Sequence, residues 1–492
     1  MTLGYTGEYG AIREGRVGID PSVDTAPAHP TRIAVAGASG YVGQLLIRRL
    51  AASGHRIVAI ARRRGHLESC EALEVVSADV GDIAATAAVL SGVETAYYLV
   101  HAMASGQGFA DRERLQARAF GAAARQAGVG RIIYLGALGD EDLSAHLRSR
   151  QEVGTLLRES GVPVVELRCA VVLGAGSISF EMLRSLTERL PVMVCPRWVS
   201  TRLQPLAECD LLAYLEESLG VPPGIYELGT PDVTDYGQMM RSYAEARGLR
   251  PRRILRVPLL TPSLSSRWVD LFSPVNRQIS RALVDSLISE VVVHRPEVST
   301  TVFSVRPLTV RAAIEKAIED ERLAVSTDLF DRPEGWHGGV HTVRKAVPVP
   351  ASLVDEIRSD LRRVGGDLGW YGMSWAWRLR LAMGRPFGER LGLHRPERLV
   401  AAAPVDWWTV ARVDDDQLVL ASANWFCGEG WLGYSVRSGP ARLEQVAAFR
   451  PKGLLGLAYW RVLCPIHRVV FRRMVRHRVN RAARHSAPVS IS

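Results

Sequence analysis

Short apolar runs alternate with amphipathic stretches from residue 31 onward. The apolar runs have the length of buried strands, and the stretches between them have the three- and four-residue spacing of helices. The predicted strands cover residues 33–36, 57–61, 73–76, 96–100, 132–135 and 162–167, and the predicted helices cover 41–52, 83–90, 111–127 and 146–160. This alternation predicts an α/β fold with a parallel sheet covered by helices on both faces.

A different pattern follows residue 330, beyond which nine of the 11 tryptophans lie. A helical stretch at 351–364 precedes four strand-like runs, and a long helix is predicted from about residue 454. The four runs cover 407–413, 417–425, 431–436 and 441–449. Several strands closed by a C-terminal helix predict an α+β domain.

These shifts in pattern divide the chain into four segments. Residues 1–30 lack periodicity and are rich in Gly, Pro, Asp and Thr, so we expect a disordered extension there. Residues 31–325 form the predicted α/β domain, in which residues 170–325 provide a cap over the sheet. The α+β domain is expected at 335–480, and a disordered basic tail at 481–492.

The net charge of +10 is concentrated at one end of the 492-residue chain, because residues 445–492 carry ten basic residues and no carboxylate. In the final helix, apolar residues recur at helical spacing between the arginines: Leu463, Ile466, Val470, Phe471, Met474 and Val475. Either this helix packs on the sheet with a solvated arginine face, or residues 461–484 contact an anionic membrane peripherally. No recognition motif accompanies the charge, so we expect no nucleic-acid partner.

Composition limits the class of protein further. With 47% hydrophobic and 23% charged residues, the chain is not disordered throughout. The six cysteines form no close pair, which predicts no metal site and a reducing compartment. The sequence has no signal-peptide pattern and no apolar run of about 18 residues. We therefore expect a cytoplasmic location, with peripheral contact at the inner membrane face as the alternative.

A glycine-rich turn joins the first predicted strand to the first helix, with the spacing Gly37-x-x-Gly40-x-x-Gly43. In a dinucleotide-binding fold the first glycine allows a tight turn, the second lets the backbone approach a pyrophosphate, and the third allows close helix–strand packing. The backbone amides predicted to face phosphate oxygens are those of Ser39, Tyr41 and Val42. This context predicts a nicotinamide dinucleotide site.

Three arginines, Arg62, Arg63 and Arg64, follow the second predicted strand where an NAD-specific fold places an acidic residue. A guanidinium at that position suits the 2′-phosphate of NADP, so NADPH is favoured over NADH. The alternative is a solvated turn in an arginine-rich chain. After the third strand, Asp79 and Val80 are placed to meet the adenine.

These motifs, together with Tyr97-Tyr-Leu-Val-His101 and Arg131-Ile-Ile-Tyr-Leu-Gly136, make residues 31–320 resemble the atypical short-chain dehydrogenase/reductases. The likeness is to their NmrA-like and complex I 39-kDa-subunit-like branch. It implies a Rossmann domain that binds NAD(P)H and an oxidoreductase ancestry.

Active members of that superfamily use a Ser–Tyr–Lys set. By this resemblance His146 stands at the tyrosine position and Arg150 at the lysine position, and residues 136–138 supply no serine. No lysine precedes Lys316. His146 could serve as acid or base, and Arg150 could hold ribose hydroxyls; otherwise His146 is a polar residue in a degenerate site. His101 either lines the nicotinamide side of the cleft or caps its strand.

Residues 335–480 resemble an uncharacterised bacterial domain related to the helix-grip (START or polyketide-cyclase-like) group. The sequence motifs that carry this resemblance begin at Tyr371, Asp406, Phe449 and Tyr459. This resemblance implies an apolar cavity for a small hydrophobic molecule, unless the aromatic residues only fill a core. Together the two parts indicate an oxidoreductase-like protein that reduces or isomerises a hydrophobic carbonyl or enone. The alternative is a non-catalytic NADPH-binding sensor or assembly factor.

Overall fold

The computed structural model describes residues 31–62, 69–101, 108–139, 143–256, 284–332, 334–337, 339–365, 396–425 and 427–485. Some of the predictions concern residues outside these ranges. They are the predictions for residues 1–30, for Arg63 and Arg64, and for the motif that begins at Tyr371.

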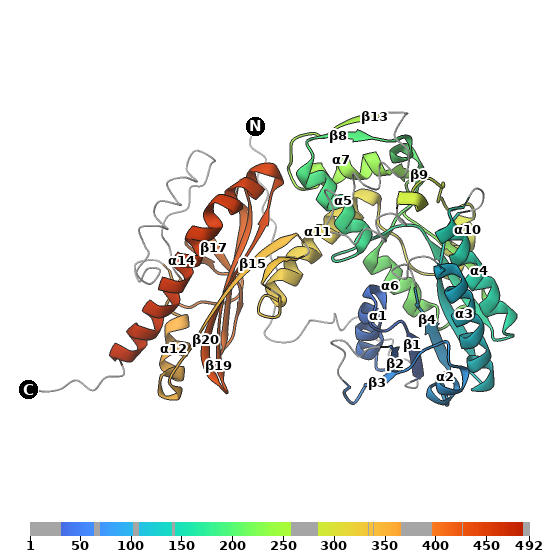
Figure 1. The fold of residues 1–492 in the computed structure, drawn as a ribbon, viewed down its shortest axis with the longest axis horizontal. Helices are drawn as coiled ribbons and strands as arrows, with labels where there is room; N and C mark the ends of the chain where they lie inside the picture. Colours follow the sequence, from blue (N-terminus) through green and yellow to red (C-terminus); the bar gives the residue numbers. More distant parts are fainter. Residues whose placement is uncertain are drawn as a thin grey trace, which may run out of the picture.

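The N-terminal domain is built on a seven-stranded parallel sheet with the order β11-β6-β5-β4-β1-β2-β3 (Figure 1). Its strands are β1 (Arg32–Ala36), β2 (Arg56–Ala61), β3 (Leu73–Ser77), β4 (Thr95–Tyr98), β5 (Arg131–Ala137), β6 (Val164–Cys169) and β11 (Gly224–Leu228). The order reverses between β1 and β4, and folds of this type have their ligand crevice at such a switch point, at the carboxyl ends of the strands. The expected Rossmann-type α/β fold is confirmed.

Helices cover both faces of this sheet. They are α1 (Tyr41–Ala52), α2 (Ile83–Val89), α3 (Phe109–Gln126), α4 (Ala145–Glu159) and α6 (Glu208–Glu217). Ile33 and Val35 of β1 belong to the core beneath α1 and α6, whereas Ala34 and Ala36 belong to the core beneath α3 and α4. A strand that is buried on both faces has a continuous run of apolar residues in the sequence. The sequence pattern therefore predicts the positions of these strands well.

Residues after β6 build the cap around a separate apolar core. Its elements include β7 (Val172–Leu173), α5 (Ile178–Arg189), β8 (Val192–Cys195), η2 (Arg197–Ser200), β9 (Arg202–Leu203), β10 (Leu206–Ala207), β12 (Thr234–Asp235), α7 (Tyr236–Ala246), β13 (Arg253–Arg256), α10 (Pro296–Val302) and α11 (Val310–Thr327). Trp198 is buried in this core with its ring centroid 6.0 Å from that of Tyr236. Gln204 donates to the Thr230 carbonyl and accepts from the Val293 amide. Both residues therefore support the cap itself.

The C-terminal domain is a seven-stranded antiparallel sheet with the order β14-β15-β20-β19-β18-β17-β16. Its strands are β14 (Gly335–His337), β15 (Val340–Pro348), β16 (Pro404–Val405), β17 (Trp408–Val413), β18 (Gln417–Trp425), β19 (Gly428–Ser438) and β20 (Ala441–Pro451). The helices α12 (Val354–Leu361) and α14 (Gly453–His485) pack on one face, and α11 approaches the other (Figure 1). The expected α+β domain closed by a long helix is confirmed.

Two details of this domain differ from the sequence analysis. The strands β14 and β15 were not predicted, although β15 pairs along its length with β20. Helix α14 continues to His485, so residues 481–485 are helical and do not begin a disordered tail. Trp407, Trp408, Trp431 and Trp460 are buried in its two cores.

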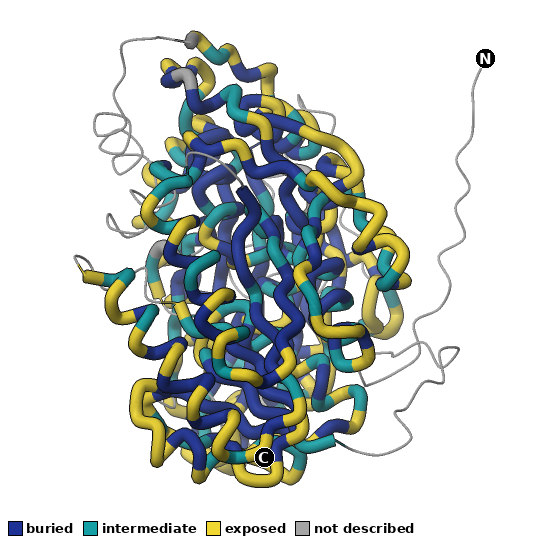
Figure 2. The backbone as a smooth tube through the Cα atoms, turned by 90° about the vertical axis from the view of Figure 1, so that its right-hand side faces the viewer, coloured by how far each residue is buried: buried dark blue, intermediate teal, exposed yellow. Residues whose placement is uncertain are grey.

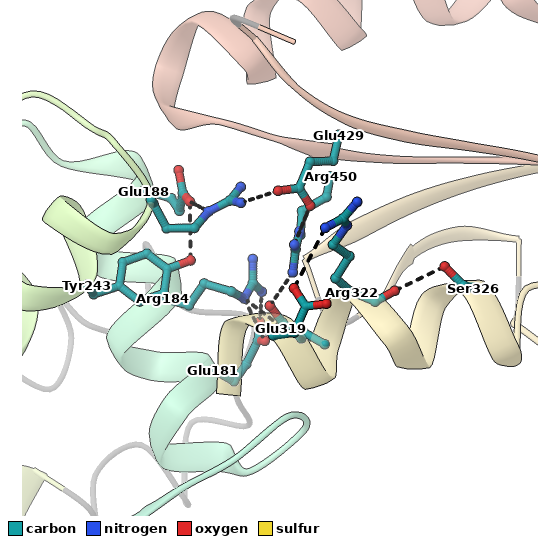
Figure 3. Close-up of polar contacts among 11 residues, drawn as sticks. Glu181, Arg184, Glu188, Tyr243, Glu319, Arg322, Ser326, Glu429 and Arg450 are labelled. Atoms are coloured by element: carbon teal, nitrogen blue, oxygen red, sulfur yellow. Dashed lines mark hydrogen bonds and ion pairs between the residues drawn. The ribbon is translucent and has the colours of Figure 1, made fainter. Parts of the chain in front are cut away.

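The two domains meet through a buried network of charged side chains (Figure 3). Figure 2 shows the buried positions, in dark blue, running through the interior of the molecule. Arg247, the C-cap residue of α7, donates to Glu188 of α5 at 3.1 Å and to Glu429 of β19 at 2.6 Å. Arg450 of β20 pairs with Glu429 and, at 2.8 Å, with Glu321 of α11. Burial raises the pKa of Glu429, but Arg450 and Arg247 lower it, and the net shift is downward. The cap and the antiparallel sheet therefore share one set of ion pairs.

Candidate functional site: a dinucleotide crevice with a histidine pair

The glycine-rich turn has the geometry that a dinucleotide-binding turn requires. Gly37 has φ +88°, and a Cβ atom added there would lie 2.6 Å from the Leu99 carbonyl oxygen. A Cβ atom on Gly43 would lie 2.4 Å from the carbonyl oxygen of Gly37. Gly40 is the N-cap of α1 and has no side-chain cap, so the first-turn amides, including those of Tyr41 and Val42, lack intrahelical partners. Such a cradle fits a pyrophosphate.

The residues predicted to meet the adenosine lie between β2 and α2. Arg62 is exposed immediately after β2, and its carbonyl accepts from Ser77 Oγ at 3.2 Å. Asp79 is exposed, and its Oδ1 accepts from the Gly81 amide at 3.0 Å in the turn that leads into α2. Val80 is buried beside it. The structure thus places these predicted residues at one edge of the sheet, and their contacts with a cofactor stay a prediction.

The Tyr41 side chain links the glycine-rich turn to α6, a contact the sequence analysis did not include. Its hydroxyl donates to Glu208 Oε2 at the start of α6. Burial and the nearby Asp320 raise the pKa of Glu208, Lys316 lowers it, and the net result is a pKa of about 7. No local pattern indicates this pair, because the two residues are 167 positions apart.

A histidine held by a carboxyl group lies at the carboxyl end of β4. His101 Nδ1 lies 3.1 Å from Glu113 Oε1, and Ser149 Oγ donates to Glu113 Oε2 at 2.5 Å. Glu113 is buried on α3, whereas 31% of the His101 side chain is exposed. Burial lowers the pKa of His101, and the hydrogen bond to Glu113 raises it, with a net lowering. Bonding at Nδ1 fixes the ring and leaves Nε2 to exchange a proton.

The ring of His146 stacks on that of His101, with centroids 4.9 Å apart and planes 11° from parallel. Burial, His101 and Arg150 together lower the pKa of His146 to about 3, opposed by Glu113. Its Nδ1 atom is buried and has no hydrogen-bond partner among the described residues. His146 is therefore neutral at physiological pH and forms a flat surface behind His101.

Arg150 is buried and bonded to the main chain. Its guanidinium donates to the carbonyl oxygens of Val100, at 3.1 Å, and of Leu135, and it lies over the ring of Tyr134. These bonds join the ends of β4 and β5. Two nitrogen atoms of the Arg150 guanidinium already donate to backbone carbonyl oxygens. A contact between Arg150 and a ribose stays a prediction. At the position of the missing serine, Ala137 and Leu138 are buried and carry no hydroxyl.

The structure thus brings His101, His146 and Arg150 together beside the switch point of the sheet and adds Glu113, which sequence reasoning missed. A signal for Glu113 existed, because it lies three and four residues before Gln116 and Ala117 on the buried face of α3. Within the described ranges no group of three or more His, Cys, Asp or Glu residues could hold a metal.

The sheet order, the glycine-rich turn and the crevice define a dinucleotide-binding α/β domain joined to an antiparallel-sheet domain. Residues 37–172 match a family described as NAD(P)H-binding, and residues 336–474 match a family described as a protein of unknown function, DUF2867. The N-terminal half therefore carries an NAD(P)H-binding domain of Rossmann fold.

Similar proteins cover the chain in part. An uncharacterized protein of Mycobacterium tuberculosis (strain H37Rv) is 31% identical over 144 residues, and so is one of Mycobacterium bovis; the match spans 29% of this chain but 15% of each relative. Among solved structures, the NADPH-dependent quinone oxidoreductase of Escherichia coli is 20% identical and aligns over 57% of this chain and 98% of its own, with a TM-score of 0.48. Triphenylmethane reductase of Citrobacter sp. is 19% identical over 58% and 99% of the two chains, with a TM-score of 0.48. The identification of the domain rests on the family match and the turn geometry.

Proposed function

We propose that this chain is an NADPH-dependent oxidoreductase that reduces or isomerises a carbonyl or enone group of a hydrophobic molecule. The observation that carries the proposal is the pairing of His101 with Glu113 beside the dinucleotide crevice. A partly exposed imidazole fixed by a buried carboxyl group is a common arrangement for general acid–base catalysis.

In this reaction the bound dinucleotide supplies the hydride. The chain's own task is to orient the substrate and to deliver one proton to the carbonyl oxygen, so that a ketone becomes an alcohol. The lowered pKa of His101 favours release of that proton, and Glu113 stabilises the imidazolium before release. Phe109, whose ring centroid is 6.5 Å from that of His146, adds apolar surface suited to a hydrophobic substrate.

The alternative is a non-catalytic NADPH-binding sensor. Two observations favour it: Arg150 is bonded to backbone carbonyls, and Ala137 and Leu138 supply no hydroxyl to polarise a substrate. The two functions differ in one measurable property, which is whether hydride leaves the cofactor.

We expect deuterium to pass from stereospecifically labelled NADPH to at least one member of a panel of lipophilic ketones and enones.

Loss of a general acid lowers kcat by about 100-fold or more. We therefore expect His101→Asn to lower kcat by that factor while NADPH affinity stays within about threefold. As a positioning residue, Glu113 should act through His101, so Glu113→Gln should shift the pH profile of kcat. His477→Asn, an exposed histidine of α14, is the control. Tight NADPH binding without label transfer by the unaltered protein would establish the sensor instead.

We also propose that Arg62 gives the site its preference for NADPH. The support is its exposed position directly after β2, where a guanidinium can pair with a 2′-phosphate. Arg62→Ala should weaken NADPH binding roughly tenfold more than NADH binding, as measured by fluorescence titration. Arg56→Ala removes an exposed arginine from the opposite end of the same strand and should change neither affinity. Equal losses for the two cofactors would remove the assignment.

A further inference from the structure

Helix α14 has an outer face that the fold does not bury. Its inner face packs on the sheet through Trp460, Val470, Phe471, Met474 and Val475. On the outer face Leu455 and Val462 are 70% and 69% exposed, and Ile466 and Val469 are more than half exposed. The spacing of seven, four and three residues places these four side chains in one stripe along the helix. The sequence pattern grouped Ile466 with the inner residues, but the structure turns it outward.

A cationic pocket adjoins this stripe. Its lining consists of Lys345 of β15 with Arg468, Val469, Arg472, Arg473 and Arg476 of α14, around a volume of about 410 Å³. Within the described ranges none of these five basic side chains makes an ion pair, and no carboxylate lines the pocket. Five neighbouring positive charges repel one another unless an anion lies between them. The pocket therefore suits a phosphate-bearing group.

The attachment of α14 favours a helix lying along a surface over one crossing a bilayer. By length and composition alone, residues Gly453–Arg484 could span a membrane, and 22% of their most apolar window is buried. However, the Gly453 amide donates to Glu188 Oε2 of the cap at 2.6 Å, so the first residue of the helix is bonded to the N-terminal domain. The inner face is occupied by the sheet. In the described part of the chain the outer face stays exposed, and α14 lies on the side of the sheet away from the N-terminal domain (Figure 1).

We propose that the outer face of α14 docks the protein on an anionic lipid surface. Leu455, Val462, Ile466 and Val469 enter the boundary between headgroups and acyl chains, and the pocket around Lys345 holds a lipid phosphate. An exposed apolar stripe combined with unpaired arginines is the pattern of interfacial helices. Charge complementarity selects the lipid, because no carboxylate among the described residues lines the pocket or pairs with its five basic side chains. This docking is independent of the dinucleotide site.

Vesicle co-sedimentation of the full chain tests the proposal. Binding is expected to vesicles of phosphatidylcholine that contain roughly 30% phosphatidylglycerol, whose charge gives the surface a negative potential, and not to vesicles of phosphatidylcholine alone. Each basic group near the lipid contributes about fivefold, so R472Q/R476Q should lower partitioning by roughly tenfold or more. The matched control R118Q/R125Q removes two exposed arginines from α3 and should change nothing.

A second pair of variants tests how much the exposed apolar side chains of α14 contribute to vesicle binding. Val462→Ser should weaken vesicle binding severalfold, whereas Leu115→Ser on α3, where the parent side chain is also 69% exposed, should not. Inorganic phosphate at millimolar concentration should compete only weakly, because it occupies the pocket without engaging the stripe. Equal binding to neutral vesicles, no effect of R472Q/R476Q, or a dimer in solution that Val462→Ser dissociates would each overturn the proposal.

Discussion

Gly43→Ala is expected to weaken NADPH binding roughly 100-fold while the rest of the fold persists. The added methyl group would lie 2.4 Å from the Gly37 carbonyl oxygen and 3.1 Å from the Ala38 Cα atom. Both are backbone atoms of the turn, so the clash is relieved only by moving α1 away from β1. That movement displaces the amides that form the phosphate cradle, and binding depends on their positions.

Gly220→Ala provides the matched control for this change. Its added methyl group would meet no atom closer than 3.9 Å, and its backbone needs no left-handed conformation. NADPH affinity can be measured by quenching of tryptophan fluorescence, with circular dichroism to show that both variants fold. If Gly43→Ala binds NADPH within threefold of the unaltered protein, the turn is not the phosphate site.

The local patterns of the sequence predict the N-terminal domain well because its strands are buried on both faces and its helices on one. There the predicted helix at 41–52 matches α1, and the predicted strand at 57–61 lies within β2. In the C-terminal domain the predicted strand at 417–425 matches β18. Strand β15 could not be predicted from the pattern of apolar residues. Val340 packs toward α11 and Val343 toward α14, so apolar residues on both faces interrupt the two-residue alternation.

In the candidate site too, features set by local sequence can be predicted, whereas contacts between distant segments cannot. The glycine turn is predictable because its function depends on backbone conformation at fixed spacing. The His101–Glu113 contact depends on how α3 lies against the end of β4, and the bonds of Arg150 depend on two strand ends that come from separate parts of the chain. Resemblance placed His146 in the catalytic role, whereas the geometry favours His101, because only His101 has a carboxyl partner.

The domain interface is the part least visible from sequence, and it leads to the second large effect. Arg450→Met is expected to lower the free energy of unfolding by about 3–5 kcal/mol. It removes a buried positive charge and, among the described residues, leaves Glu429 with Arg247 alone and Glu321 with Arg184 alone. Arg450 is 2% exposed and bonds Glu429 of its own domain and Glu321 of α11. Met fills a similar volume, so the loss measures the missing charge and not a cavity.

Urea unfolding followed by tryptophan fluorescence measures this effect, since the Trp431 ring lies 5.8 Å from the Arg450 guanidinium. Arg311→Met removes a 63% exposed arginine from ion pairs on the surface of α11 and should cost less than about 1 kcal/mol. Adding Glu429→Gln and Glu321→Gln to Arg450→Met should recover part of the loss, because neutral amides do not need the missing guanidinium. If the interface couples the domains, Arg450→Met should also split one unfolding transition into two. A loss below about 1 kcal/mol with one transition would mean that the buried ion pairs do not hold the domains together.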